Sequence, residues 1–194
     1  MADKFTVLDK MLLLSHEHAG PAIKLQWQLS LTRIERWVNN DVFRFNWWLL
    51  LAMFLFSVTV WWKTVKKPRL REISMYVLFI IILTLVLDEI GEEFTLWDYP
   101  YDLFPLFPPL SAIDLACLPF IYSLIYQRFG TWKSFIIATV IMSGIFCFIL
   151  EPIFVRIGIY QMLTWKSYYG FPIYALMGIV SKAAVKRVCM ISPQ

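Results

Sequence analysis

Long apolar runs separated by short polar segments dominate the chain from residue 43 onward. A membrane-spanning helix needs about 20 mainly apolar residues, because each residue advances about 1.5 Å through a hydrocarbon core about 30 Å thick. Five runs approach that length, namely residues 43–62, 73–90, 110–126, 134–155 and 171–184. The pattern predicts an all-α fold, a polytopic transmembrane helix bundle of about five spans in residues 43–184.

Prolines mark the irregular parts of this bundle. The segment GEEFTLWDYPYDLFPLFPP, residues 91–109, contains four prolines yet remains too apolar for a free loop. We expect it to fold back into the membrane interface, because proline interrupts a helix and lipid disfavours irregular backbone. Pro152 is expected to bend the chain at the end of the fourth run, and Pro172 fits the first turn of the fifth helix.

Residues 1–42 form an extension with a different pattern. Apolar and charged positions alternate there at roughly helical spacing, at Lys24, Leu25, Leu29, Arg33 and Ile34. This spacing predicts an N-terminal amphipathic surface helix, broken by Gly20-Pro21. Residues 39–41, two asparagines and an aspartate, are expected to cap the first span.

Composition supports the membrane assignment. Of 194 residues, 59% are apolar and 16% charged, whereas soluble domains carry roughly 45–50% and about 25%. The net charge of +4 comes from basic residues beside the apolar runs, where they orient a membrane protein, so no nucleic-acid partner is expected. The run Met11–Leu14 is too short for a cleavable signal, so the first span is expected to direct insertion. The expected partner is the lipid bilayer.

The basic residues also predict an orientation. They cluster in the first and third connections between spans and at the end of the chain, at Lys63, Lys66, Lys67, Arg69, Arg71, Arg128, Lys133, Lys182, Lys186 and Arg187. Basic connections stay in the cytoplasm. With five spans, the C-terminal tail at residues 185–194 is cytoplasmic and the N-terminus is outside, an orientation that the basic residues of the N-terminal segment oppose.

Four carboxylates crowd the end of the second span. Asp88 and Glu92, like Glu89 and Glu93, are spaced by four residues, so they share helix faces. Like charges at this spacing repel, and acids at a helix C-terminus oppose its dipole. The segment is either a solvated acidic connection or a cation or proton site.

Two further acids lie within or beside apolar runs, Asp114 and Glu151. A charged residue at the centre of a span costs about 2.5–3.5 kcal/mol, so it usually faces the bundle interior. In the five-span arrangement Asp88, Glu89, Asp114 and Glu151 reach the same outer level of the membrane and are candidate ligands for an ion, with Arg156 as counter-ion. Shallow carboxylates that reach the interface without a role are the alternative.

Aromatic residues flank this level. Trp97 and Tyr99 precede the third run, and Tyr160 and Trp165 precede the fifth. Anchoring at the interface is their ordinary role. Facing inward beside carboxylates, the same rings form the rim of a pocket for an organic cation or an isoprenoid-like ligand.

The sequence gives little support for a metal site, a phosphate-binding loop or a catalytic nucleophile. His16-Glu17-His18 is too compact to place two histidines on one helix face, and the three cysteines have no metal-binding spacing. There is no Gly-rich phosphate loop and no nucleophile elbow. The sequence therefore predicts no metal, no cofactor and no nucleophilic catalysis.

The chain from Asp88 onward resembles an uncharacterised family of small five-span membrane proteins from spore-forming Bacillus and Clostridium relatives. The resemblance is carried by ordered landmarks, namely Asp88, WDYPYDLFP, Asp114 with Pro119, Gln127, Trp132, EPIFVRIGIY and WKSYYGFPIY. It implies a five-span bundle in a bacterial plasma membrane and supplies no activity.

Three functions remain open. The first is binding or passage of a small cation or amphiphile through a carboxylate-lined, aromatic-rimmed pocket. The second is an accessory subunit that docks partner membrane proteins through its N-terminal helix. The third is an intramembrane enzyme in which paired carboxylic acids protonate and deprotonate a lipid or isoprenoid.

Overall fold

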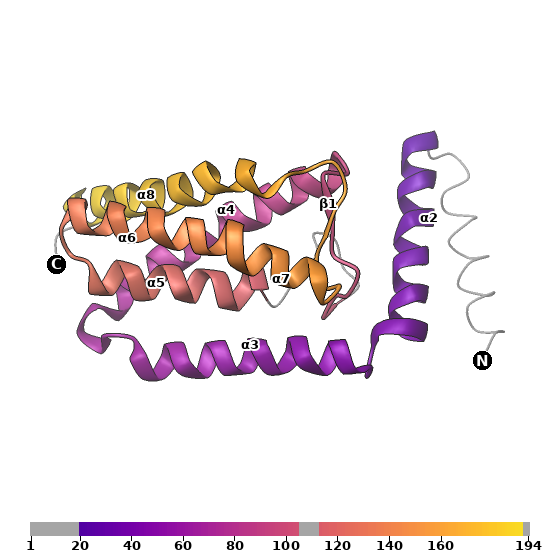
Figure 1. The fold of residues 1–194 in the computed structure, drawn as a ribbon, viewed down its shortest axis with the longest axis horizontal. Helices are drawn as coiled ribbons and strands as arrows, with labels where there is room; N and C mark the ends of the chain where they lie inside the picture. Colours follow the sequence, from indigo (N-terminus) through magenta and orange to yellow (C-terminus); the bar gives the residue numbers. More distant parts are fainter. Residues whose placement is uncertain (1–19, 105–112, 192–194) are drawn as a thin grey trace.

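The computed structural model describes residues 20–104 and 113–191, and this part of the chain is all-α apart from one pair of two-residue strands. The longer helices are α2 (Pro21–Arg36), α3 (Phe45–Thr64), α4 (Leu70–Glu93) and α8 (Ser167–Ile191). The shorter helices are α5 (Leu118–Arg128), α6 (Trp132–Ile145) and α7 (Glu151–Arg156). All except α2 run back and forth along one axis, and α2 lies across one end (Figure 1). The predicted all-α fold is confirmed.

Three described stretches are long and apolar enough to cross a membrane, Phe45–Thr64, Lys67–Glu93 and Trp132–Arg156. Helix α8 has 25 residues, but its C-terminal half carries Lys182, Lys186 and Arg187. Many large apolar side chains on these helices are more than half exposed, among them Leu55, Phe56, Leu78, Ile141 and Phe148. Such a surface suits lipid, so the fold is compatible with a membrane protein.

Two prolines alter the helices without ending them. A π-helical turn, Ile113–Cys117, precedes Pro119, and a second, Phe146–Leu150, precedes Pro152. Because proline has no N–H, the helix accommodates it with a wider turn. The fourth apolar run therefore stays helical through Pro152 to Arg156.

Two predicted helix starts are wrong. Helix α8 begins at Ser167, so Pro172 lies inside it rather than in its first turn. The same helix also continues to Ile191, past the predicted end of the fifth span at residue 184. Residues 39–41 do not cap α3, because Val42, Phe43 and Arg44 intervene and Arg44 occupies the N-cap position. Asp41 instead ends a π-helical turn, Trp37–Asp41, and its carboxylate lies 3.8 Å from Nε of Arg36.

The core lies between α4, α5, α6 and α8 and is rich in aromatic rings. Tyr76 and Tyr126 stack with centroids 4.2 Å apart, and Phe135 meets both rings edge-on. Gly178 lets α8 approach closely, since a Cβ there would lie 2.8 Å from the ring of Tyr122. These contacts fix the rotation of α4 and α8, which carry the site described next.

Candidate functional site

The C-terminal part of α4 contributes a buried carboxylate. Asp88 is only 6% exposed and lies one turn beyond the buried Thr84, on the same face of the helix. The hydroxyl of Tyr99 donates a hydrogen bond of 3.0 Å to Oδ1 of Asp88. Tyr99 is itself buried, so a tyrosine from the α4–α5 connection positions this carboxylate.

Two connections are joined over this end of the bundle. Strand β1 (Trp97–Asp98) pairs antiparallel with strand β2 (Gln161–Met162), Trp97 opposite Met162. The carbonyl oxygen of Leu96 accepts the backbone N–H groups of residues 163, 164 and 165 at 3.0–3.1 Å. The α4–α5 and α7–α8 connections therefore form one unit.

Trp97 lies directly against α4 because residue 91 is a glycine. A Cβ at Gly91 would overlap the indole ring of Trp97, which occupies the space that any other side chain would need. On its other side, the ring of Trp97 meets that of Trp165 edge-on, with centroids 5.1 Å apart. The indole nitrogen of Trp97 is buried and has no hydrogen-bond acceptor among the residues that the structure describes.

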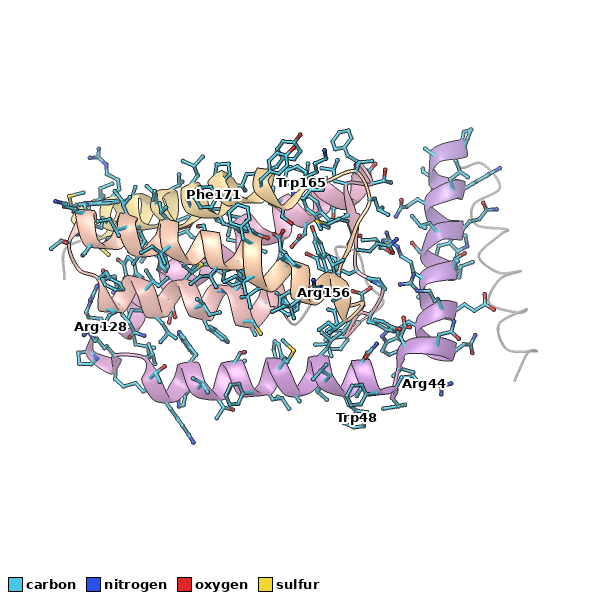
Figure 2. All side chains as sticks on the ribbon, in the orientation of Figure 1. Arg44, Trp48, Arg128, Arg156, Trp165 and Phe171 are labelled. Atoms are coloured by element: carbon cyan, nitrogen blue, oxygen red, sulfur yellow. The ribbon has the colours of Figure 1, made fainter. Side chains whose placement is uncertain are left out.

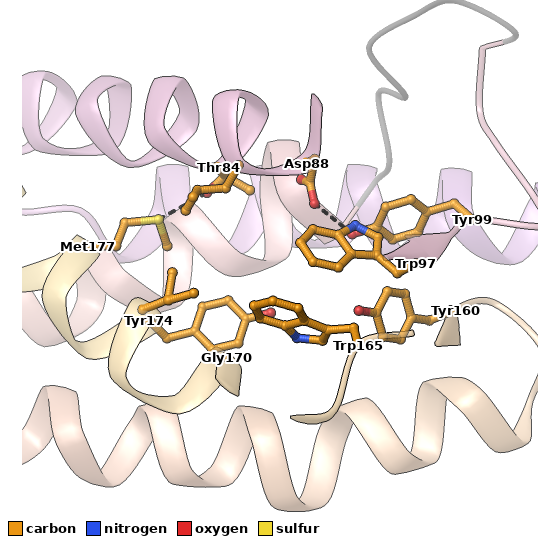
Figure 3. A pocket seen from close by; sticks show the side chains of 11 residues that line it. Thr84, Asp88, Trp97, Tyr99, Tyr160, Trp165, Gly170, Tyr174 and Met177 are labelled. Atoms are coloured by element: carbon orange, nitrogen blue, oxygen red, sulfur yellow. Dashed lines mark hydrogen bonds between the residues drawn. The ribbon is translucent and has the colours of Figure 1, made fainter. Parts of the chain in front are cut away.

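These side chains surround a cavity of about 50 Å³ (Figure 3). Its polar and aromatic lining consists of Thr84, Asp88, Trp97, Tyr99, Tyr160, Trp165 and Tyr174. Leu87, Gly170, Ile173 and Met177 complete it. One described carboxylate thus faces several ring surfaces, and none of the described lining residues is basic.

Glu151 lies behind one wall of this cavity. It is 6% exposed, and its Oε1 accepts a hydrogen bond of 3.0 Å from the hydroxyl of Tyr174. Gly170 allows the ring of Tyr174 to pack closely, since a Cβ there would lie 3.2 Å from that ring. Tyr174 therefore separates the Glu151 carboxylate from the cavity that Asp88 lines.

The remaining predicted site residues are placed differently. Glu89 is partly buried and is not among the described residues that line the cavity. One of its carboxylate oxygens has no hydrogen-bond partner within the described ranges. The backbone of Asp114 lies in the π-helical turn before α5, and its side chain is outside the described part of the structure. Arg156 is exposed and belongs to none of the ion pairs found in residues 20–104 and 113–191, so these pairs do not support its predicted role as counter-ion.

A larger crevice of about 310 Å³ lies between α2 and this end of the bundle. Its charged lining comprises Arg33, Glu92, Glu93 and Asp98, and Arg33 pairs with Glu92 at 3.4 Å. Trp97 lines both the crevice and the smaller cavity. The indole of Trp97 therefore stands between the Asp88 cavity and a space beneath α2.

Helix α2 is held over this end by the α4–α5 connection. Arg36 donates to the carbonyl of Pro100 at 3.0 Å, and the indole nitrogen of Trp37 donates to the carbonyl of Asp102 at 3.0 Å. Burial raises the pKa of Asp102 to about 7, although the guanidinium of Arg36 favours its charged form. Burial also raises the pKa of Asp41, and the nearby guanidinium of Arg36 acts in the opposite direction by lowering it.

Several residues of the cavity were missed by the sequence analysis. Tyr174, Thr84 and Met177 lie within apolar runs, where they resemble ordinary membrane-facing or packing residues. Spacing gave one usable signal, because Thr84 is four residues from Asp88 and so shares its helix face. The glycines at 91 and 170, isolated within helices, were a second signal of close approach.

The described residues contain no group of three or more His, Cys, Asp or Glu that could hold a metal ion. His16 and His18 lie outside the described ranges. No protein-family model, curated protein or solved structure matches this chain.

Proposed function

We propose that this protein is a membrane-embedded receptor or conduit for a small ammonium-type cation, which binds at Asp88. The observation that carries the proposal is a carboxylate, 6% exposed, in a cavity lined by tyrosine and tryptophan rings. A carboxylate attracts an ammonium group through charge and hydrogen bonds, and the low dielectric of a buried site strengthens that attraction. Aromatic faces attract ammonium groups and add contact with their apolar hydrogens.

The size of the cavity selects among the ligands expected from the sequence. A volume of about 50 Å³ suits ammonium or methylammonium. Binding sites for drug-sized amphiphiles are roughly 300–1,000 Å³. The cavity therefore favours the small cation over an amphiphile or an isoprenoid.

The same proposal includes a five-span arrangement in a bacterial plasma membrane, with the N-terminus and the Asp88 cavity outside. It is supported by the alternating directions of α3, α4, α5, α6–α7 and α8 (Figure 1). The resemblance carried by the landmarks after Asp88 points the same way. In this arrangement α2 lies along the outer surface as the amphipathic helix, and the crevice beneath it leads ligands towards Trp97.

The test is direct binding of radiolabelled methylammonium to the purified full-length chain in nonionic detergent. Asp88→Asn keeps the shape of the side chain and an acceptor for Tyr99 but removes the charge, and should weaken binding at least tenfold. Glu35→Gln is the matched control, since Glu35 is exposed on α2 and the change also removes one negative charge. Unchanged binding in Asp88→Asn would refute the proposal.

An acid–base enzyme is the second candidate, favoured by two carboxyl–tyrosine pairs, Asp88 with Tyr99 in the cavity lining and Glu151 with Tyr174 at and behind its wall. An enzyme requires product formation from a candidate lipid, lost in Glu151→Gln. Release of bound methylammonium unchanged, in the presence of such lipids, would favour the receptor. The accessory-subunit hypothesis predicts instead that deleting residues 1–40 removes co-purifying membrane proteins.

A further inference from the structure

A groove lies at the end of the bundle that carries the first and third connections and the C-terminus, away from α2. It is about 410 Å³ in volume and runs between the C-terminal ends of α3 and α5. Figure 2 labels Arg128 at this end and Arg44 at the opposite one. The groove is lined by Thr64, Lys66, Leu124, Ile125, Arg128 and Phe129, among others.

The groove combines an apolar wall with two cations. Leu124 and Phe129 are each more than a third exposed, and Ile125 lies one position beyond Leu124 on α5. Lys66 and Arg128 are both exposed. Arginine binds phosphate oxygens through two parallel N–H groups, and lysine binds them as a point charge.

Lys66 is fixed in place by α5. Its backbone N–H donates to Oε1 of Gln127 at 3.0 Å, and its Nζ donates to the backbone carbonyl of Gln127 at 2.9 Å. An ammonium group has three N–H donors, so this bond leaves capacity for a ligand. The cation is thus positioned in the groove before any ligand arrives.

The C-terminus of a helix carries partial negative charge, which should repel an anion. Here that charge is already compensated, because the last carbonyls near α5 accept ammonium donors. Lys66 bonds the carbonyl of Gln127, and the buried Lys182 of α8 donates to the carbonyls of Phe129 at 3.1 Å and Gly130 at 3.4 Å. The end of α5 therefore leaves no uncompensated partial charge at these carbonyls to repel an anion beside Lys66 and Arg128.

We propose that this groove binds the phosphate of an anionic phospholipid headgroup through Lys66 and Arg128. An acyl chain then lies along Leu124, Ile125 and Phe129. Basic pockets between membrane helices on the cytoplasmic side recognise such headgroups. The inference rests on the membrane location proposed above but is independent of cation binding at Asp88, which lies at the other end of α4.

The experiment is native mass spectrometry of the full-length protein in nonionic detergent, titrated with dioleoyl phosphatidylglycerol or dioleoyl phosphatidylcholine. Phosphatidylglycerol should bind preferentially. The double variant Lys66→Gln/Arg128→Gln should lower its affinity about 25-fold, about fivefold for each cation. The matched control Lys63→Gln/Arg71→Gln removes the same charge at the same end from exposed residues outside the groove, and should change affinity less than twofold.

Arg128→Gln alone keeps the test decisive if loss of Lys66 disturbs the fold, since Lys66 bonds Gln127 and Arg128 is exposed. It should lower affinity about fivefold. Equal binding of phosphatidylcholine, or equal losses in the control variant, would overturn the inference. Displacement of the lipid by millimolar inorganic phosphate would also overturn it, because it would identify a phosphate site without a lipid contribution.

Discussion

At the scale of single residues, the hydrogen bond from Tyr99 to Asp88 is the contact that organises the cavity. Tyr99→Phe removes the hydroxyl and keeps the ring. We expect it to lower the free energy of unfolding by roughly 1.5–3 kcal/mol, the usual contribution of a hydrogen bond to a charged group. Tyr168→Phe is the control, because Tyr168 is exposed and should change little. Thermal unfolding of both variants measures the difference, and equal midpoints would contradict the assigned role.

Gly91 provides a second prediction at this scale. Gly91→Ala places a methyl group within the ring of Trp97, so the indole must move or α4 must shift. Overpacking of this kind destabilises by roughly 1–3 kcal/mol, and we expect an altered tryptophan emission and weaker methylammonium binding. Gly130→Ala is the control, since a Cβ there meets nothing within 4 Å. Wild-type emission and binding in Gly91→Ala would show that Trp97 has room to adjust.

Some residues of the cavity could be predicted from the sequence, and others could not. The sequence predicted five residues that the structure places around one cavity, namely Asp88, Trp97, Tyr99, Tyr160 and Trp165. They were candidates because an acid at the end of an apolar run, with aromatic residues near it, is conspicuous in the sequence. Their role in binding stays a prediction. Tyr174 was missed because its direction depends on how α8 is rotated against α5 and α6, which no local pattern encodes. That rotation is set by contacts such as Gly178 with Tyr122.

At the scale of elements, the docking of the α4–α5 connection under α2 should depend on pH through Asp102. Its pKa in the folded protein, about 7, exceeds the ordinary value of 3.8, so the folded state holds the proton more tightly. The contribution of Asp102 to the stability of the docked connection is complete below pH about 4 and is lost as the pH rises through about 7. Hydrogen exchange of residues 97–104, corrected for intrinsic rates, should therefore be slower at pH 5 than at pH 8.

Asp102→Asn removes the titrating group and should flatten this pH dependence. Glu35→Gln, at an exposed acid of α2, should retain it. A pH dependence that persists in full in Asp102→Asn would assign the effect to another carboxyl group.

The elements also show where periodicity is a sufficient guide and where it is not. Apolar runs located α3, α4 and the stretch Trp132–Arg156 to within a few residues, because burial in lipid requires a continuous apolar segment. The β1–β2 pair joins residues more than 60 positions apart and is two residues long, so no local pattern could indicate it. The two π-helical turns before Pro119 and Pro152 arise because a continuous helix must accommodate these prolines, whereas sequence rules treat proline as a point where a helix bends or ends.

At the scale of the whole molecule, the proposed orientation places the Asp88 cavity outside and the basic groove inside. Single cysteines at Thr95, Lys166 and Thr64, with Cys117, Cys147 and Cys189 replaced by alanine, would test it by labelling intact cells. All three positions are exposed. Labelling at residues 95 and 166 but not at 64 is expected, and the reverse pattern would place the cavity in the cytoplasm.

The joined connections have a kinetic consequence. Because the carbonyl of Leu96 accepts three N–H groups and β1 pairs with β2, Trp97 and Trp165 are carried by one hydrogen-bonded unit. If a cation bound at Asp88 as proposed leaves past Trp97, the reorientation of one loop alone does not release it, because several hydrogen bonds must break together, as in local unfolding. Such events take microseconds to seconds, whereas exposed side chains reorient in nanoseconds or less. Residence time at Asp88 should therefore be governed by the stability of this small strand pair rather than by the strength of the ion's own contacts.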